Sequence, residues 1–244
     1  MFSQHRTKAI ILKKENNGEA DESFWVFTKD FGMVKIFAKA VKKLNSKLRG
    51  QIQVFYLSEI EFIEGRVRKT LVDAVAINKF SYLRQSLLKI RLAYSFSKVF
   101  CALVKKQEPD QNLWELLKAF FLTVDKVEIS AKRALSIYYF FFWGLLGILG
   151  YRLELDYCHL CRRAIVSDNG FWQDPFNGIS CRACLNLIRT KREQISSRTV
   201  YFLKAAFNGH WGEVDSLTLE GDTFEELKLF TKVYFNFIRQ SNHL

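Results

Sequence analysis

The first eighty residues alternate between polar positions and β-branched or aromatic ones, in short runs separated by turn residues. Such runs, bounded by Gly, Asn and Asp, predict β-strands joined by tight turns. Five of them in about eighty residues favour a small closed barrel, and in a basic chain we expect the oligonucleotide-binding (OB) type. The runs are residues 7–14, 24–28, 33–38, 51–63 and 70–77.

Aromatic side chains are dense in the second and third runs and in the turn between them. In OB barrels, exposed aromatics of this region stack on the bases of single strands, but most aromatics in alternating strands belong to the core. We therefore expect that at most about two of five candidate aromatics are exposed and available for stacking on bases. These are Phe24, Trp25, Phe27, Phe31 and Phe37.

After Phe80 the apolar period lengthens to that of a helix. A first amphipathic helix is predicted before Glu108, with an apolar stripe formed by Leu83, Leu87, Ile90, Tyr94, Ser97 and Cys101. Further helices are expected from about residue 111 to 124, from about Ser130 onward, and over residues 201–211 and 224–240.

The segment from Ala134 to Tyr151 has no charged residue over eighteen positions. By length it is a marginal candidate for a membrane span. Its second half contains three glycines, and basic residues flank it on both sides, so no orientation in a membrane is favoured. A helix that is apolar all round is also typical of the centre of a helical bundle, and we interpret the segment as buried core without a membrane partner.

Four of the five cysteines form two Cys-x-x-Cys pairs, Cys158/Cys161 and Cys181/Cys184, with nineteen residues between them. This spacing is typical of a four-sulfur zinc site, in which a closed shell leaves no position for substrate. We therefore predict one structural Zn²⁺ ion. Disulfides and a redox-active pair are the alternatives, and His159 could in principle replace one ligand. Cys101, alone in an apolar stretch, is interpreted as a small buried hydrophobe.

The chain carries a formal net charge of +12, which favours a polyanionic partner such as nucleic acid. The densest basic stretch runs from Lys35 to Arg49 and contains no acidic residue, although such a run can also be only a solvated face. We predict that DNA contacts its cations, Lys35, Lys39, Lys42, Lys43, Lys47 and Arg49. Possible additional contacts are Arg6, Lys8, Arg66, Arg68, Lys69, Arg162 and Arg163.

Motifs for catalysis are not found in the sequence. It contains no His-Glu-x-x-His, no phosphate-binding Gly-x-x-x-x-Gly-Lys-[Ser/Thr] and no His-x-Glu before the cysteines. We therefore expect a binding protein and not an enzyme. The charge and the cysteines alone also allow a zinc-ribbon transcription or ribosome-associated factor.

The chain resembles the bacterial RecO recombination-mediator family along essentially its whole length. Three segments carry the resemblance: TKDFGMVKIFAKAVKK at 28–43, FFFWGLLGILGYRLELDYCHLC at 140–161 and NGISCRACLN at 177–186. Their order and spacing are more specific than any one of them. The chain departs from the family pattern at Ala40, where glycine is common, and at Trp143-Gly144, near a position where the family often has glutamate.

The resemblance implies a DNA-repair protein that binds single- and double-stranded DNA and anneals complementary strands. It also implies partners, namely RecR and the acidic C-terminal tail of the single-strand-binding protein, and a role in loading the recombinase onto coated gaps. Such a protein acts in the cytoplasm, in association with the nucleoid. The helical part, with Arg84, Lys89 and Arg91, is the expected place for the acidic tail.

The expected fold class is therefore α+β. We predict an OB-fold DNA-binding domain over residues 1–79 and an α-helical domain over 80–151 and 193–244. A zinc module, residues 152–192, is predicted as an insertion in the helical domain.

Overall fold

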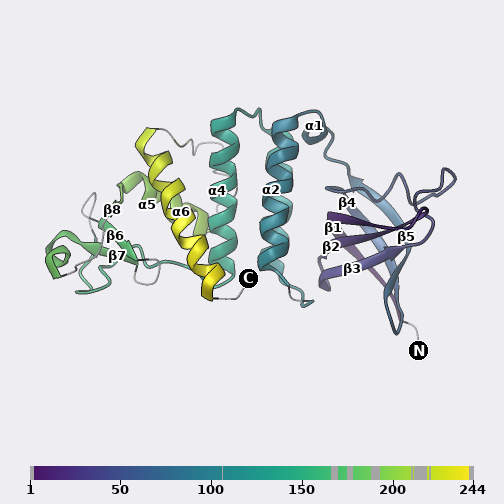
Figure 1. Cartoon of the computed structure of the whole chain (residues 1–244), viewed down its shortest axis with the longest axis horizontal. Coiled ribbons are helices and arrows are strands. Elements are labelled where there is room, and N and C mark those ends of the chain that lie inside the picture. Colours follow the sequence, from purple (N-terminus) through teal and green to yellow (C-terminus); the bar gives the residue numbers. More distant parts are fainter. Residues whose placement is uncertain are drawn as a thin grey trace. The chain divides into compact units, whose positions relative to one another are not determined.

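The computed structural model describes residues 3–105, 107–165, 170–174, 178–187, 193–209, 211, 219 and 221–241. The chain forms two compact units, Met1–Ile129 and Ser130–Leu244. The first unit contains a barrel and three helices, and the second contains three helices and a small sheet (Figure 1).

Five strands form a closed barrel in the order β1-β2-β3-β5-β4. All neighbouring strands are antiparallel except β3 and β5, which pair in parallel. The predicted OB-type barrel is thus confirmed. The strands are β1 (Ser3–Asn17), β2 (Asp21–Thr28), β3 (Gly32–Ala38), β4 (Leu57–Glu64) and β5 (Lys69–Asn78).

The fourth predicted run, 51–63, is a strand only from Leu57 onward. Phe55 has a φ of 70°, outside the range of an extended chain, and its N–H donates to the carbonyl of Ile11 at 2.7 Å. Residues 51–56 therefore belong to a long β3–β4 connection that lies against β1. The connection also contributes buried Val41 and Ile52 to the barrel core, beside Phe24, Ile36 and Phe62.

The first predicted helix is two helices, α1 (Ser81–Arg84) and α2 (Leu87–Leu103). Ser86 caps α2 by accepting a hydrogen bond from the N–H of Lys89. The buried face of α2 differs from the predicted stripe, because Leu87 and Tyr94 are exposed. The buried residues are Lys89, Leu92, Ala93, Phe96, Ser97 and Phe100.

Phe96 stacks on Phe120 of α3 (Gln111–Lys126), with ring centroids 4.1 Å apart. The ammonium group of buried Lys89 donates to the carbonyl of Asp125 at 2.7 Å. These contacts join α2 to α3 within the first unit.

The second unit is organised around α4 (Ala131–Ile148), which packs with α5 (Ser197–Phe207) and α6 (Gly221–Ser241). Trp143 is fully buried, and its indole N–H donates to Thr231 of α6 at 3.0 Å. A Cβ at Gly144 would lie 2.5 Å from the Trp211 ring, so this glycine makes room for an aromatic side chain. The uncharged segment is buried core in this unit, and among the described residues no helix has the length and apolarity to cross a bilayer.

In the cysteine region, β6 (Gly170–Asp174) and β7 (Gly178–Cys181) pair in antiparallel fashion. With β8 (Glu193–Gln194) these strands form a sheet in the order β7-β6-β8. A 3₁₀ helix, η2 (Arg182–Leu187), follows β7 directly.

Candidate nucleic-acid surface and metal centre

The four paired cysteines converge on one point. The Sγ atoms of Cys158, Cys161, Cys181 and Cys184 all lie within 4.8 Å of one another. Four sulfurs at this separation can surround one tetrahedral metal ion. His159 does not belong to this group, and its backbone N–H donates to the carbonyl of Ile179 at 2.9 Å.

Local backbone structure brings the two pairs together. After Cys161 the chain turns sharply at Arg162, whose φ is 59°, and the N–H of Cys158 donates to the carbonyl of Arg163 at 2.8 Å. Cys181 ends β7 and Cys184 lies in η2, so a strand end and one turn of 3₁₀ helix present the second pair. The N–H of Cys181 points at the sulfur of Cys158, at 3.3 Å.

The electrostatics of the cluster favour a bound cation. Burial alone would raise the pKa of the Cys158 thiol, but hydrogen bonds from the backbone N–H groups of Cys161, Cys181 and Leu160 outweigh burial and lower that pKa to about 6. The pKa of Cys184 is raised to about 12, first by its hydrogen bond to Cys161 and then by burial. Several thiolates so close together repel one another unless a metal ion neutralises them. The cluster can therefore hold a metal ion.

The predicted basic run lies at the end of β3 and in the β3–β4 connection, residues 39–56. This connection is braced against the barrel. Lys42 donates through its backbone N–H to the carbonyl of Ala20 and through its ammonium group to the carbonyl of Gly18, at 3.0 and 2.8 Å. The N–H of Ala40 donates to the Asp21 carboxylate at 2.7 Å.

Apart from Lys42, whose ammonium group binds the Gly18 carbonyl, the structure separates the cations of this run into two groups. Lys39, Lys43, Lys47 and Arg49 are exposed, and among the described residues none has an acidic partner. Lys35 is different, because its ammonium group lies 2.7 Å from the Glu15 carboxylate. That contact, with those of Lys13 and Trp25, lowers the pKa of Glu15 to about 2, so Glu15 stays charged and Lys35 stays paired at neutral pH.

The possible additional DNA contacts also differ in whether they are paired with an acidic residue. Arg6 lies near Glu59 and Glu61, and Lys69 pairs with Glu64 and lowers the pKa of that carboxyl. Of the other additional candidates, Lys8, Arg66, Arg68, Arg162 and Arg163 are exposed and have no acidic partner within the described part of the chain. The Arg68 guanidinium lies over the ring of Phe37, 3.7 Å from the centroid.

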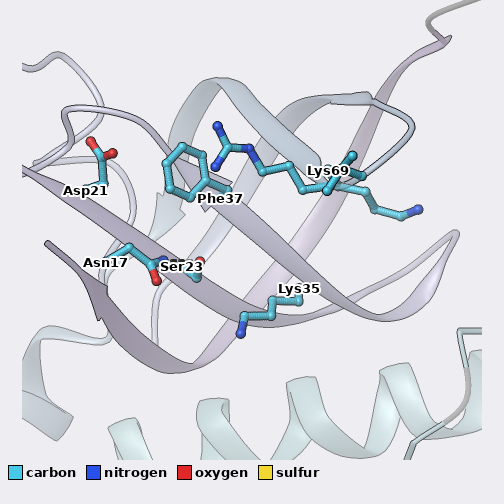
Figure 2. A pocket seen from close by; sticks show the side chains of 8 residues that line it. Asn17, Asp21, Ser23, Lys35, Phe37 and Lys69 are labelled. Atoms are coloured by element: carbon cyan, nitrogen blue, oxygen red, sulfur yellow. Dashed lines mark hydrogen bonds between the residues drawn. The ribbon is translucent and has the colours of Figure 1, made fainter.

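A groove of about 500 Å³ runs along the outer surface of the barrel. Figure 2 shows its lining, with Asn17, Asp21, Ser23, Lys35, Phe37 and Lys69 labelled. Val67 and Arg68, from the β4–β5 turn, complete the lining. In OB barrels the β2–β3 surface and the β1–β2 and β4–β5 loops form the ligand-binding face, and the groove lies on that face.

Burial sorts the five aromatic candidates as the sequence suggested. Phe24 and Phe27 are fully buried. Phe31 is partly buried against the core and packs edge-on against Phe62, with centroids 5.5 Å apart. Trp25 and Phe37 remain as half-exposed aromatics on the outer side of β2 and β3.

The three cations expected to hold an acidic peptide do not form one rim. Lys89 is only 7% exposed and binds a backbone carbonyl, so it cannot serve that role. Arg84 donates to the carbonyl of Val54 and covers the Tyr56 ring, 4.5 Å from its centroid. Arg91 is exposed on α2.

Glu15 was missed among the functional candidates. Its position facing Ser23 on β2, two residues from Trp25, depends on strand register. The signal available in the sequence was the alternation of β1, which turns Lys13, Glu15 and Asn17 to one side of the strand.

Comparison with known proteins agrees with this geometry. Residues 1–80 match the family model for the recombination protein O N terminal, and residues 84–237 match that for the recombination protein O C terminal. DNA repair protein RecO of Dehalococcoides mccartyi is 26% identical over 233 residues, which cover 96% of this chain and 90% of the relative. The protein of the same name from Clostridium novyi is 26% identical over 248 residues, which cover 98% and 90%.

Proposed function

Because the chain belongs to the recombination protein O family of DNA repair proteins, we propose that it is a non-enzymatic mediator that binds single- and double-stranded DNA and anneals complementary strands. One observation carries this proposal: a braced connection of a closed barrel holds exposed cations that have no acidic partner in the part of the chain that the structure describes. They are Lys39, Lys43, Lys47 and Arg49.

Annealing requires two polyanions to approach each other. Cations that neutralise phosphates on both strands lower that repulsion and release condensed counterions, so binding weakens steeply as salt is added. The brace at Ala40 and Lys42 supports this role, because a loop already ordered loses less conformational entropy when DNA binds. Arg66 and Lys8 extend the same charge on the barrel, and Arg162 and Arg163 supply a separate basic site beside the cysteines.

The metal is proposed to be one Zn²⁺ ion with a structural role. Four sulfurs from two Cys-x-x-Cys pairs are a common ligand set for structural zinc, and they leave no coordination position for water or substrate. When bound, the ion neutralises the clustered thiolates and ties the turn at Cys158–Arg163 to the end of β7.

We further propose that the protein cooperates with RecR, binds the acidic tail of the single-strand-binding protein and helps load the recombinase onto coated gaps at the nucleoid. For the tail, Arg91 is the remaining candidate of the three cations first considered. It lies on α2 within one turn of the exposed side chains of Leu87 and Leu88, so a cation and an apolar surface occur together.

Replacing Lys43 and Lys47 together by glutamate tests the DNA-binding surface. Both side chains are exposed and take no part in the brace, so the fold should persist. We expect affinity for a single-stranded oligonucleotide, measured by fluorescence anisotropy, to fall about tenfold or more at roughly 0.1 M salt. The slope of log K against log salt should lose about 1.5 to 2 units.

The matched control is reversal of Lys98 and Lys105, which are exposed in the same unit but outside the barrel. This variant has the same net charge and should bind DNA within about twofold of the wild type, because only long-range charge changes. Equal losses in the two variants would show that net charge, and not the connection at 39–56, governs binding.

A further inference from the structure

The outer side of β2 and β3 carries two aromatic side chains in adjacent cross-strand pairs. Ser23 lies opposite Phe37, and Trp25 lies opposite Lys35. Their neighbours along the strands, Phe24, Val26 and Ile36, are buried, so strand alternation fixes the aromatics on the outside. Each has a cation over its ring: Lys35 is 5.4 Å from Trp25 and Arg68 is 3.7 Å from Phe37.

The two pairs differ in what they can still bind. The Trp25 indole donates to Glu15 at 2.9 Å, and the same carboxylate pairs with Lys35, so the charge at that pair is already neutralised. Trp25 also does not line the groove, whereas Phe37 and Arg68 both do. Among the described residues Arg68 has no acidic partner, and its guanidinium contacts the Phe37 ring.

The Arg68 guanidinium covers the Phe37 ring, with its Cζ atom 3.7 Å from the ring centroid. At that distance the two groups are in contact and leave no space for a further group between them. Arg68 is an exposed side chain, and both residues line the groove, which has a volume of about 500 Å³. Planar nucleobases stack well on guanidinium groups and on aromatic rings.

Resting on the proposed DNA binding, we propose that the Phe37–Arg68 stack is a platform for one unpaired nucleobase. The base lies on the open face of the Arg68 guanidinium, while Phe37 holds that group flat and in place. In a duplex both faces of a base are covered by its neighbours, so this subsite binds single strands and not paired DNA. Every base has a stacking face, so the platform accepts all four bases.

The polar groups beside the stack are already hydrogen-bonded within the protein. Asn17, Ser23 and Asp21 line the same groove (Figure 2), where the Asn17 amide donates to the Ser23 hydroxyl and Asp21 accepts from the N–H of Ala40. Lys69 and Lys35, at the same groove, are paired with Glu64 and Glu15, so the groove has less free charge than the 39–56 connection. The connection thus supplies contacts to phosphates, and the groove supplies a contact to a base.

The test compares two single strands of equal charge: an oligodeoxythymidylate and a chain of the same length in which every base is replaced by tetrahydrofuran. We expect the wild-type protein to bind the base-bearing strand about tenfold more tightly, the amount typical of stacking one base. Phe37→Leu and Arg68→Lys should each reduce this preference about fivefold, with affinity for the abasic strand unchanged. Arg68→Lys retains the positive charge but removes the planar guanidinium group on which a base would stack.

Tyr82→Leu is the control, since it removes an exposed aromatic side chain outside the groove and should leave the preference intact. Equal binding of both strands by the wild type, or an unchanged preference in both variants, would overturn the stacking platform while leaving DNA binding in place. Absence of binding to either strand would overturn the proposed function together with this inference.

Discussion

Ala40 is held in a left-handed backbone conformation, with a φ of 55°. This conformation costs an alanine roughly 1–2 kcal/mol, because its Cβ lies too close to the following carbonyl oxygen. The hydrogen bond from its N–H to Asp21 keeps the strained residue in place at the start of the 39–56 connection. This is the position where the family commonly has glycine, and the backbone explains why glycine suits it.

Ala40→Gly should therefore stabilise the protein by about 0.5–1 kcal/mol, which is the relieved strain less the added entropy of an unfolded glycine. Thermal or urea unfolding measures the change. Ala38→Gly is the matched control. Ala38 is buried in β3 and its φ is not positive, so this substitution should lower the free energy of unfolding by about 1 kcal/mol. An Ala40→Gly variant less stable than the wild type would mean that the backbone at Ala40 is not strained.

At the scale of single residues, the sequence identified what depends on type and spacing. The cysteines were found by their spacing and the exposed lysines by their run. The pairing of Lys35 with Glu15 was not found, because it depends on how three strands align. The stacking of Arg68 on Phe37 was not found either, because it depends on where the β4–β5 turn folds.

At the scale of elements, the two cysteine pairs show how separate pieces of local structure bring four side chains to one point. One turn, the end of β7 and η2 contribute the four sulfurs, and among the described residues hydrogen bonds from the N–H groups of His159 and Cys181 join the first pair to β7. A metal ion bound by all four sulfurs would join the same pieces. The barrel strands were largely predictable from alternation, whereas the buried face of α2 was not, because it depends on packing against α3.

Replacing Cys158 and Cys181 together by serine should abolish bound zinc, measured as metal per chain by mass spectrometry. The melting temperature of the second unit should fall by about 10 °C or more, since metal binding contributes directly to folding. Cys101→Ala, which removes the cysteine of α2, should retain one zinc per chain. Full metal content in the double variant would contradict a four-sulfur shell.

At the scale of the whole molecule, the barrel that we propose for DNA binding lies in the first unit, and the four-cysteine cluster that we propose for a structural metal lies in the second. The cysteines are the most recognisable chemistry of the chain, yet a closed four-sulfur shell would leave no position for a further ligand. The exposed cations of the 39–56 connection and the Phe37–Arg68 stack are the parts suited to a polyanion with bases.

Annealing of two complementary labelled oligonucleotides, without added nucleotide, tests the central claim most directly. The wild type should accelerate formation of the duplex, by about tenfold or more at low salt, because its cations offset repulsion between the strands. The Lys43→Glu/Lys47→Glu variant should lose most of this acceleration, and the Lys98→Glu/Lys105→Glu variant should keep it. No acceleration by the wild type, or degradation of the strands, would contradict the account.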